Sequence, residues 1–479
     1  MAPVRAVRVP LSRLSAFGLV VVSVAATSVI VLAEPWLGPY AVLAVLVVAF
    51  GALALVLALG SLRRWLGVGA VLALTGALLL GSALAPARPS DDLWLYSMYG
   101  RTIVEHHDNP YVHPPSDYPD DPLYEHVNPY WAETTARYGP VFIGITAAVA
   151  VVAGDHPLPT RIAYQFIAAL AVFIALVLIA RRVQSAAAVA IVGLNPVTAY
   201  IVVNGGHNDA LVGLAVLGGV LLATRHRHIP AALAFTAAAL IKAPAGLALV
   251  AYLAWLAYQR GPRVFVRAAS VAGGVAFLTL LVVGVENALG PLLGSREFIL
   301  PHSPWTLFAS GGIRKAFGYG YVELGSVEHL ATVGTVTGIA VGALFVASRL
   351  RETTVLHIAV GALLAYLFVS VYTAPWYAGW VLPMIALSRR WRVSLYAFAF
   401  FAVLMIDDRF GDAVFPQVFL RQQTFQVLLA NWINTLTMLM AIGGVAILLW
   451  YRRPGSSPGE ADDAIRPGER SETQPVTPA

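Results

Sequence analysis

The sequence predicts an all-α, polytopic integral membrane protein, and its composition, its uncharged runs and the spacing of its basic residues all favour this class. Of the 479 residues, 58% are hydrophobic and 12% are charged, and the mean hydropathy is +0.74. An ordinary soluble domain has about 25% charged residues. Uncharged runs at residues 14–33, 40–59 and 162–180 approach the roughly 20 residues that an α-helix needs to cross a bilayer.

Composition also excludes several classes of function. The chain has no cysteine, so neither a disulfide nor thiolate chemistry is available to it. Its net charge of +6 comes from arginines that are dispersed in short clusters between apolar runs. Such clusters are typical of topology determinants, so we expect a lipid bilayer as partner and no nucleic acid. The first apolar run is too long for a cleaved signal and leads directly into a second run.

The basic clusters orient the predicted helices. Cytoplasmic loops of membrane proteins are rich in Lys and Arg, and the N-terminal arginines place residues 1–13 in the cytoplasm. Further clusters lie at residues 63–64, 181–182, 225–228, 260–267, 349–351, 389–392 and 452–453. Keeping all of these inside requires about 14 crossings and requires that the short run 141–152 lie at the surface or re-enter rather than cross.

This arrangement divides the chain into a cytoplasmic N-terminus at residues 1–13, a transmembrane domain and a C-terminal tail. Residues 14–453 form the transmembrane domain, with a large first extracytoplasmic loop at about 87–160 and a second at about 287–330. Shorter outward turns lie at residues 204–209, near Lys242, at 372–376 and at 407–423. Residues 454–479 are rich in Pro, Ser, Gly and charge, which predicts a disordered cytoplasmic tail.

The first outer loop begins with two adjacent carboxylates, Asp91 and Asp92. The interfacial residues Trp94 and Tyr96 follow at once, which places both acids at headgroup depth. A carboxylate partly withdrawn from water has a raised pKa and suits a general base. The alternative is that both acids only begin a solvated loop.

Two further polar groups interrupt apolar runs. Residues 204–209 read Asn-Gly-Gly-His-Asn-Asp, which suits either ligand binding or a polar turn in which Asp209 caps the next helix. Lys242 is the only lysine in the first 300 residues. A charge in the membrane centre costs about 2.5–3.5 kcal/mol, so Lys242 is a candidate phosphate ligand, unless it snorkels to the interface.

Other polar residues give weaker signals. The first loop carries His106, His107, Asp108, His113 and His126. These residue types can bind a metal, but their spacing matches no zinc pattern, so the sequence does not decide whether a metal is bound. His302, Trp305 and Arg314 in the second outer loop could bind phosphate or sugar, or could belong to an ordinary interfacial loop. Trp376 belongs either to an aromatic belt or to a sugar-stacking site.

A set of motifs runs through residues 90–390 in a fixed order. In chain order they are Asp92-x-x-x-Tyr96-x-x-x-Gly100-Arg101, Asn109-Pro110-Tyr111, Tyr138-Gly139-Pro140, Asn195-Pro196, Gly206-His207-Asn208-Asp209-Ala210-Leu211, Ile241-Lys242-Ala243-Pro244, Ser303-Pro304-Trp305 and Ala374-Pro375-Trp376-Tyr377-x-x-Trp380. Together they resemble the actinobacterial polyprenol-phosphate-mannose-dependent α-1,6-mannosyltransferases, which belong to the GT-C glycosyltransferases.

The resemblance implies a GT-C-like bundle whose active site faces the extracytoplasmic side of the cell membrane. It implies polyprenyl-phosphate-mannose as donor and a glycan or glycolipid as acceptor, with Asp92 as the base and Asp91 as the alternate. The implied substrate-binding residues are Tyr96, Arg101, Asn109, Tyr138, His207, Asn208, Asp209, Lys242, His302, Trp305, Arg314 and Trp376.

The chemistry of such a transfer agrees with these residue types. A phosphate leaving group is already a good anion, so one base is needed and a second carboxylic acid is not. In-line attack would invert the anomeric centre. Cationic groups must then stabilise the charge that develops on the phosphate. Two alternatives remain at this point: a transporter or flippase of a lipid-linked substrate, and a GT-C enzyme of different sugar specificity.

Overall fold

The computed structural model describes residues 13–58, 66–88, 90–286, 300, 302–308, 327–351, 354–388, 391–414 and 425–450. Every regular element in these ranges is a helix, which confirms the all-α architecture. Arg314, the tail at 454–479 and most of the predicted outer segments 287–330 and 407–423 lie outside the described residues.

Helices of the first half of the chain lead from the N-terminus through the polar loop to the centre of the molecule. They are α1 (Arg13–Ala33), α2 (Pro39–Ala58), α4 (Val68–Leu84), α5 (Asp92–Val104), α6 (Pro140–Ala153), α7 (Pro157–Val183), α8 (Ala186–Gly193), η5 (Val197–Asn204), α9 (Asp209–Thr224), α10 (His228–Ile241), α11 (Gly246–Gln259) and α12 (Pro262–Val283). The three uncharged runs predicted as helices lie in α1, α2 and α7, as expected.

Helices of the second half complete the bundle. They are α15 (Val327–Arg349), α16 (Val355–Val369), α17 (Ala378–Ile385), α18 (Trp391–Val414) and α19 (Phe425–Trp450). Consecutive helices pack as pairs, with α1 on α2, α9 on α10, α15 on α16 and α18 on α19. The short helix α17 inserts between α9 and α16, so the second half reaches the core of the first.

Several helices are long and apolar enough to cross a membrane. Six pass this test among the described residues, and α8 with η5, bent by 49°, would make a seventh span. Six shorter apolar helices accompany them, α6 among them. With its 14 residues α6 is about 21 Å long, against a hydrocarbon core of about 30 Å. A polytopic membrane protein is confirmed, and the number of crossings stays a prediction.

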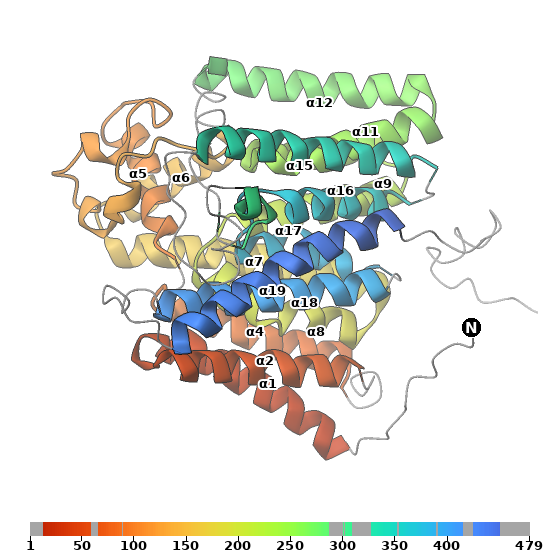
Figure 1. Cartoon of the computed structure of the whole chain (residues 1–479). Coiled ribbons are helices and arrows are strands. Elements are labelled where there is room, and N and C mark those ends of the chain that lie inside the picture. Colours follow the sequence, from red (N-terminus) through yellow and green to blue (C-terminus); the bar gives the residue numbers. More distant parts are fainter. Residues whose placement is uncertain are drawn as a thin grey trace, which may run out of the picture.

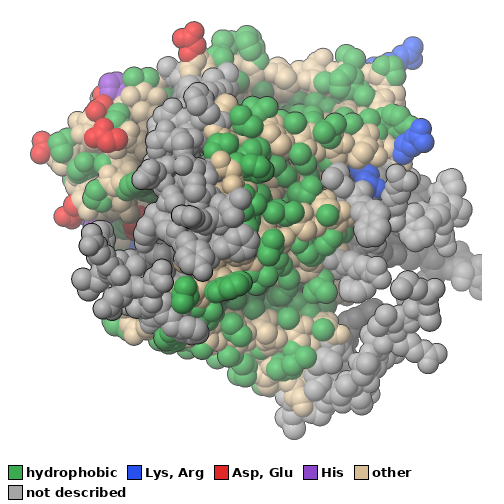
Figure 2. All heavy atoms as spheres, viewed as in Figure 1, with side chains coloured by type: hydrophobic (Ala, Val, Ile, Leu, Met, Phe, Trp, Pro, Cys, Tyr) green, Lys and Arg blue, Asp and Glu red, His purple; other side chains and the backbone are tan. Residues whose placement is uncertain are grey.

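On the face shown in Figure 2, exposed acidic and basic side chains lie toward different ends of the bundle. The long helices lie roughly parallel, and the lobe built by α5, α6 and the loop between them stands at one end, away from the first residues of α1 (Figure 1). Acidic and histidine side chains gather on this lobe, whereas the visible lysines and arginines lie mainly toward the other end (Figure 2). This is the distribution expected if the lobe is extracytoplasmic.

A buried ion cluster fixes the lobe. Arg101 on α5 contacts both carboxylate oxygens of Asp121 at 2.8 Å and reaches Asp155 at 2.8 Å. Its guanidinium also donates to the carbonyl of Gly154, while His106 contacts Asp121 at 2.8 Å. The cluster therefore ties the loop to the junction of α6 and α7.

The two acidic partners of Arg101 differ in burial, which gives a test of this cluster. The Asp121 side chain is 0% exposed and that of Asp155 is 63% exposed. We expect Asp121→Asn to destabilise the lobe by about 3 kcal/mol or more, because it leaves a buried guanidinium undercompensated. Asp155→Asn should cost under about 1 kcal/mol. Thermal unfolding in detergent and limited proteolysis of the loop measure both, and equal effects would contradict the assignment.

Candidate functional site

Four segments that are far apart in the sequence meet at one end of the bundle. Asp92 begins α5, residues 204–209 link η5 to α9, Lys242 ends α10, and residues 372–380 lead into α17. His207 Nδ1 lies 3.6 Å from Asp92 Oδ2, and Lys242 Nζ lies 2.9 Å from Asp209 Oδ1. The predicted outward turns thus come together in space, and they bring Asp92, His207, Asp209, Lys242 and Trp376 into one cluster.

Asn204 anchors the turn at residues 204–209 to the end of α4 and the residues that follow it. Its amide donates to the carbonyls of Ser82 and Pro86 at 2.9 Å, and its oxygen accepts from the Arg88 N–H at 3.1 Å. The preceding segment η5 is a π-helix, a rare form that is frequent at functional sites. Gly206 then adopts φ +66, a left-handed conformation that favours glycine.

A buried ion pair joins α9 to α10. Lys242 Nζ donates to both oxygens of Asp209, at 2.9 and 3.1 Å, and the indole N–H of Trp380 also donates to Asp209. The ammonium lies 4.6 Å from the ring centre of Tyr377 and 5.6 Å from that of Trp380. Lys242 is therefore a buried charge that Asp209 compensates and that aromatic rings surround.

Asp92 is the one carboxylate of the cluster without an ion partner at close range among the described residues. Its side chain is 20% exposed, its backbone N–H donates to Ser90, and Tyr96 donates to its Oδ2 at 3.3 Å. Burial raises the pKa of Asp92 to about 6, while the charge of Lys242 acts in the opposite direction. A carboxylate of this pKa is ionised at neutral pH and is a stronger base than an ordinary aspartate.

Asp91 differs from Asp92 in the exposure of its side chain and in its hydrogen-bond partner. Its side chain is exposed, and its Oδ2 accepts a hydrogen bond from the Asn128 amide at 3.2 Å. It stands at the N-cap position of α5 but makes no capping hydrogen bond with its side chain. These surroundings favour Asp92 over Asp91 as the candidate base.

His207 is covered by Trp376. The two rings stack at 4.5 Å between centres with an interplanar angle of 12°. Burial lowers the pKa of His207 well below its usual value, and the charges of Lys242 and Arg409 add to this, so the imidazole is neutral. Neither of its ring nitrogens has a hydrogen-bond partner among the described residues, and the same holds for both amide atoms of Asn208.

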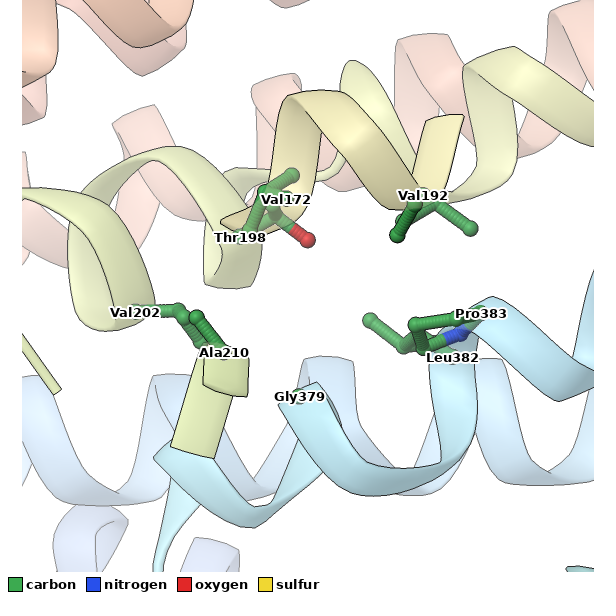
Figure 3. Close-up of a pocket in the computed structure, with 9 residues that line it drawn as sticks. Val172, Val192, Thr198, Val202, Ala210, Gly379, Leu382 and Pro383 are labelled. Atoms are coloured by element: carbon green, nitrogen blue, oxygen red, sulfur yellow. The ribbon is translucent and has the colours of Figure 1, made fainter. Parts of the chain in front are cut away.

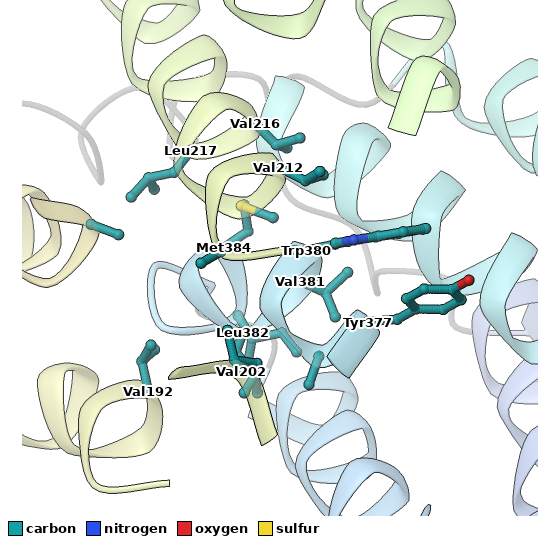
Figure 4. Close-up of a cluster of buried hydrophobic side chains, with 14 of the residues drawn as sticks. Val192, Val202, Val212, Val216, Leu217, Tyr377, Trp380, Val381, Leu382 and Met384 are labelled. Carbon is teal, nitrogen blue, oxygen red and sulfur yellow. The ribbon is translucent and has the colours of Figure 1, made fainter. Parts of the chain in front are cut away.

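Aromatic and aliphatic packing fixes the backbone around these groups. Tyr96 makes edge contacts with Tyr138 and Phe142 at 5.0 and 4.9 Å between ring centres. Behind the ion pair, Val212 and Val216 of α9 gather with Trp380 and Met384 of α17 in one buried cluster (Figure 4). The helices on both sides of the polar site are therefore held together by apolar packing.

The other predicted site residues lie apart from this cluster. Arg101 is nine residues beyond Asp92 on α5, about 13 Å along the axis, and it is engaged in the loop cluster. Asn109 accepts from the Tyr111 N–H within its own turn, and the Tyr111 hydroxyl donates to the Tyr138 carbonyl. Asn109 thus supports Tyr138 indirectly.

The buried His302 and the half-buried Trp305 form a second group near the 372–380 segment. His302 contacts Asp407 at 3.2 Å and the Thr373 carbonyl at 2.8 Å, and the indole of Trp305 donates to the Val369 carbonyl. Burial lowers the pKa of His302, but Asp407 and the Thr373 carbonyl outweigh this and raise it overall. His302 therefore braces the segment that carries Trp376, and Trp305 holds the end of α16 just before it.

Sequence reasoning missed three members of this region. Tyr377 and Trp380 surround Lys242, whereas their motif had suggested an aromatic belt or rings that stack on a sugar. Arg409 of α18 is buried, contacts Asp408 at 2.8 Å and acts electrostatically on His207. The triplet Asp407-Asp408-Arg409 inside an otherwise apolar run was the available signal.

A small cavity lies next to the cluster in the interior of the bundle. A cavity of about 10 Å³ lies between α7, α8, η5, α9 and α17, lined by apolar side chains and Thr198 (Figure 3). No group of three metal-ligating side chains occurs within the described ranges. Of the loop histidines, His113 contacts Asp117 and His126 stacks on Trp94.

The ion pair can be tested by replacing its members singly and together. Lys242→Met should destabilise the protein by about 3–5 kcal/mol, because it leaves the buried Asp209 carboxylate unpaired. Adding Asp209→Asn should restore most of the loss, since an amide oxygen still accepts from Trp380. Thermal unfolding in detergent measures both. If Lys242→Met alone leaves the melting temperature unchanged, the pair has no structural role.

Comparisons with known proteins give a consistent result. Residues 11–259 match a family described as "Alpha-(1->6)-mannopyranosyltransferase, N-terminal domain". The chain is 28% identical over 266 residues to alpha-(1->6)-mannopyranosyltransferase A of Mycobacterium tuberculosis, covering 50% of this chain and 51% of that protein. It is 29% identical over 304 residues to alpha-(1->6)-mannopyranosyltransferase B of Corynebacterium glutamicum, covering 56% and 50%.

A third similarity extends further along the chain. A protein of Mycolicibacterium smegmatis named "Probable alpha-(1->6)-mannopyranosyltransferase" is 26% identical over 394 residues, covering 70% of this chain and 68% of that protein. The chain spans about half the length of the first two relatives. No solved structure gave a significant match.

Proposed function

The chain belongs to the α-(1→6)-mannopyranosyltransferase family, and we propose on this basis that it transfers a mannosyl residue to a glycan or glycolipid acceptor. The observation that carries the proposal within the site is Asp92, a partly buried carboxylate with a raised pKa in a cluster of aromatic and polar side chains. The relatives' names give the sugar and the linkage of those proteins, and we extend both to this chain.

We propose polyprenyl-phosphate-mannose as the donor and the extracytoplasmic face of the cell membrane as the place of reaction. A polyprenyl carrier suits a polytopic protein because its hydrocarbon tail can lie in lipid beside the helices. The acidic lobe at one end and the basic residues toward the other support the outward orientation of the site (Figure 2).

In the proposed reaction Asp92 accepts the proton of the acceptor hydroxyl as its oxygen attacks the anomeric carbon. The new carbon–oxygen bond forms while the bond from that carbon to the phosphate oxygen breaks, and the electron pair leaves with the phosphate. Attack from the face opposite the phosphate inverts the anomeric configuration. One carboxylate is sufficient, because the departing phosphate needs no proton.

Lys242 has a different role in this scheme from the phosphate ligand suggested by its sequence context. Both oxygens of Asp209 hold its ammonium, so it acts as a positioning residue that joins α9 to α10. Its positive charge also favours the ionised form of Asp92. The ring of Tyr138 lies beside the Lys242 ammonium, and Trp376 stacks on His207.

Replacing the base gives the first test. Asp92→Asn should lower transfer of radiolabelled mannose from polyprenyl-phosphate-mannose by about 100-fold or more, because general base catalysis contributes roughly 10²–10⁴-fold. Asp91→Asn is the matched control and should retain most activity, since Asp91 is exposed and bound to Asn128. Full activity of Asp92→Asn with loss in Asp91→Asn would transfer the role to Asp91.

The pH dependence gives a second test. Because Asp92 must be ionised to accept a proton and its pKa is about 6, kcat/KM should fall as the pH drops through about 6. An unperturbed aspartate would keep its activity down to about pH 4. Initial rates in membranes between pH 4.5 and 8, with each preparation returned to pH 7.5 afterwards, separate titration from denaturation. An acid limb near pH 4 would contradict the assigned environment of Asp92.

A further inference from the structure

Two neighbouring side chains in the site carry buried polar atoms without protein partners. His207 is 0% exposed and Asn208 is 2% exposed. Both ring nitrogens of the first and both amide atoms of the second make no hydrogen bond to any described residue. A buried polar group left unsatisfied costs about 1–3 kcal/mol, so four such atoms in sequence-adjacent residues require an explanation.

Structural roles do not account for Asn208. It occupies the N-cap position of α9, but its side chain makes no capping hydrogen bond. Asn204, four residues earlier and equally buried, shows what a structural asparagine does in this turn: its amide is fully engaged with the end of α4 and the segment that follows. The two asparagines therefore differ in their partners and not in their burial.

The chemical character of the unpartnered atoms indicates the ligand. A neutral imidazole offers one donor and one acceptor, and a carboxamide offers an NH₂ donor and a carbonyl acceptor. A hydroxyl group can both donate a hydrogen bond to such atoms and accept one from them. A fully ionised phosphate has no donor and can only accept. The nearby ammonium of Lys242 is already engaged by Asp209, and Asp92 places a carboxylate 3.6 Å from His207. These surroundings favour a polyhydroxylated ligand over an anion.

We propose that His207 and Asn208 bind the hydroxyl groups of a hexose beside Asp92, and that Asn208 thereby helps to determine which sugar the site accepts. This proposal rests on the proposed function and assigns the part of the substrate that this turn contacts. The hexose is either the mannosyl group of the donor or the sugar unit of the acceptor, since both present the same chemistry.

The distance between His207 and Asp92 agrees with this assignment. At 3.6 Å the imidazole nitrogen and the carboxylate oxygen are too far apart for a direct hydrogen bond. A hydroxyl oxygen about 2.8 Å from each of them could donate to the carboxylate and accept from the ring N–H. Trp376 closes the other face of the imidazole, so a hydroxyl would approach from the side of the partly exposed Asp92.

The test replaces Asn208 by leucine, which has a similar volume and no hydrogen-bonding atoms. Because no described residue bonds to the Asn208 amide, Asn208→Leu should leave the melting temperature in detergent unchanged or higher. Transfer of mannose should nevertheless fall by about 10- to 100-fold in kcat/KM. The matched control, Asn204→Leu, should lower the melting temperature, because it breaks bonds to Ser82 and Pro86.

Deoxy analogues identify the hydroxyl and its source. Wild type should discriminate against donors or acceptors that lack the bound hydroxyl, and Asn208→Leu should lose this discrimination for that hydroxyl alone. If Asn208→Leu loses its discrimination against donor analogues, the bound hydroxyl belongs to the donor sugar. If it loses its discrimination against acceptor analogues, the hydroxyl belongs to the acceptor. Inhibition by polyprenyl phosphate, which lacks the sugar, should be unchanged in Asn208→Leu.

The outcomes distinguish a failure of the hexose assignment from a failure of the proposed function. If wild type transfers mannose but Asn208→Leu discriminates among the analogues as wild type does, the hexose assignment is overturned while the proposed function stands. Weaker inhibition of Asn208→Leu by polyprenyl phosphate would also overturn it, in favour of phosphate binding. If wild type transfers no mannose to any acceptor, the proposed function fails, and this assignment fails with it.

Discussion

The arrangement of the site depends on one buried ion pair, Lys242 with Asp209. The two residues lie on different helices, and their charges are tolerable inside the bundle only because each compensates the other. Trp380 from the second half of the chain donates to the same carboxylate, and Tyr377 lies over the ammonium. The pair therefore fixes α9, α10 and α17 relative to one another.

This constraint explains why the site has two carboxylates with different roles. Asp209 is fully buried and paired, so it positions its neighbours. Asp92 is partly exposed, and its carboxylate has the Tyr96 hydroxyl and the neutral His207 imidazole as close neighbours. Desolvation raises its pKa, so it can accept a proton. Between them, the turn at 204–209 presents His207 and Asn208, whose polar atoms have no described protein partner.

The second half of the chain takes part in the site through its aromatic residues. The family match covers residues 11–259 and contains Asp92, His207, Asp209 and Lys242. Trp376 covers His207, and Trp380 binds Asp209, although both lie beyond residue 259. His302 and Asp407 brace the segment that carries these rings. The polar groups of the first half thus acquire part of their low-dielectric surroundings from the second half.

The sequence by itself determined the all-helical membrane architecture, because uncharged runs near 20 residues have few other stable arrangements, and ordered motifs identified Asp92, His207 and Lys242 as residues of interest. It did not determine their partners. Lys242 and Asp209 are 33 positions apart, and Trp380 is 171 from Asp209. Likewise Arg101, close to Asp92 in sequence, serves the loop instead. Only the tertiary structure decided these roles, because hydrogen bonds and ion pairs depend on distances that helix packing sets.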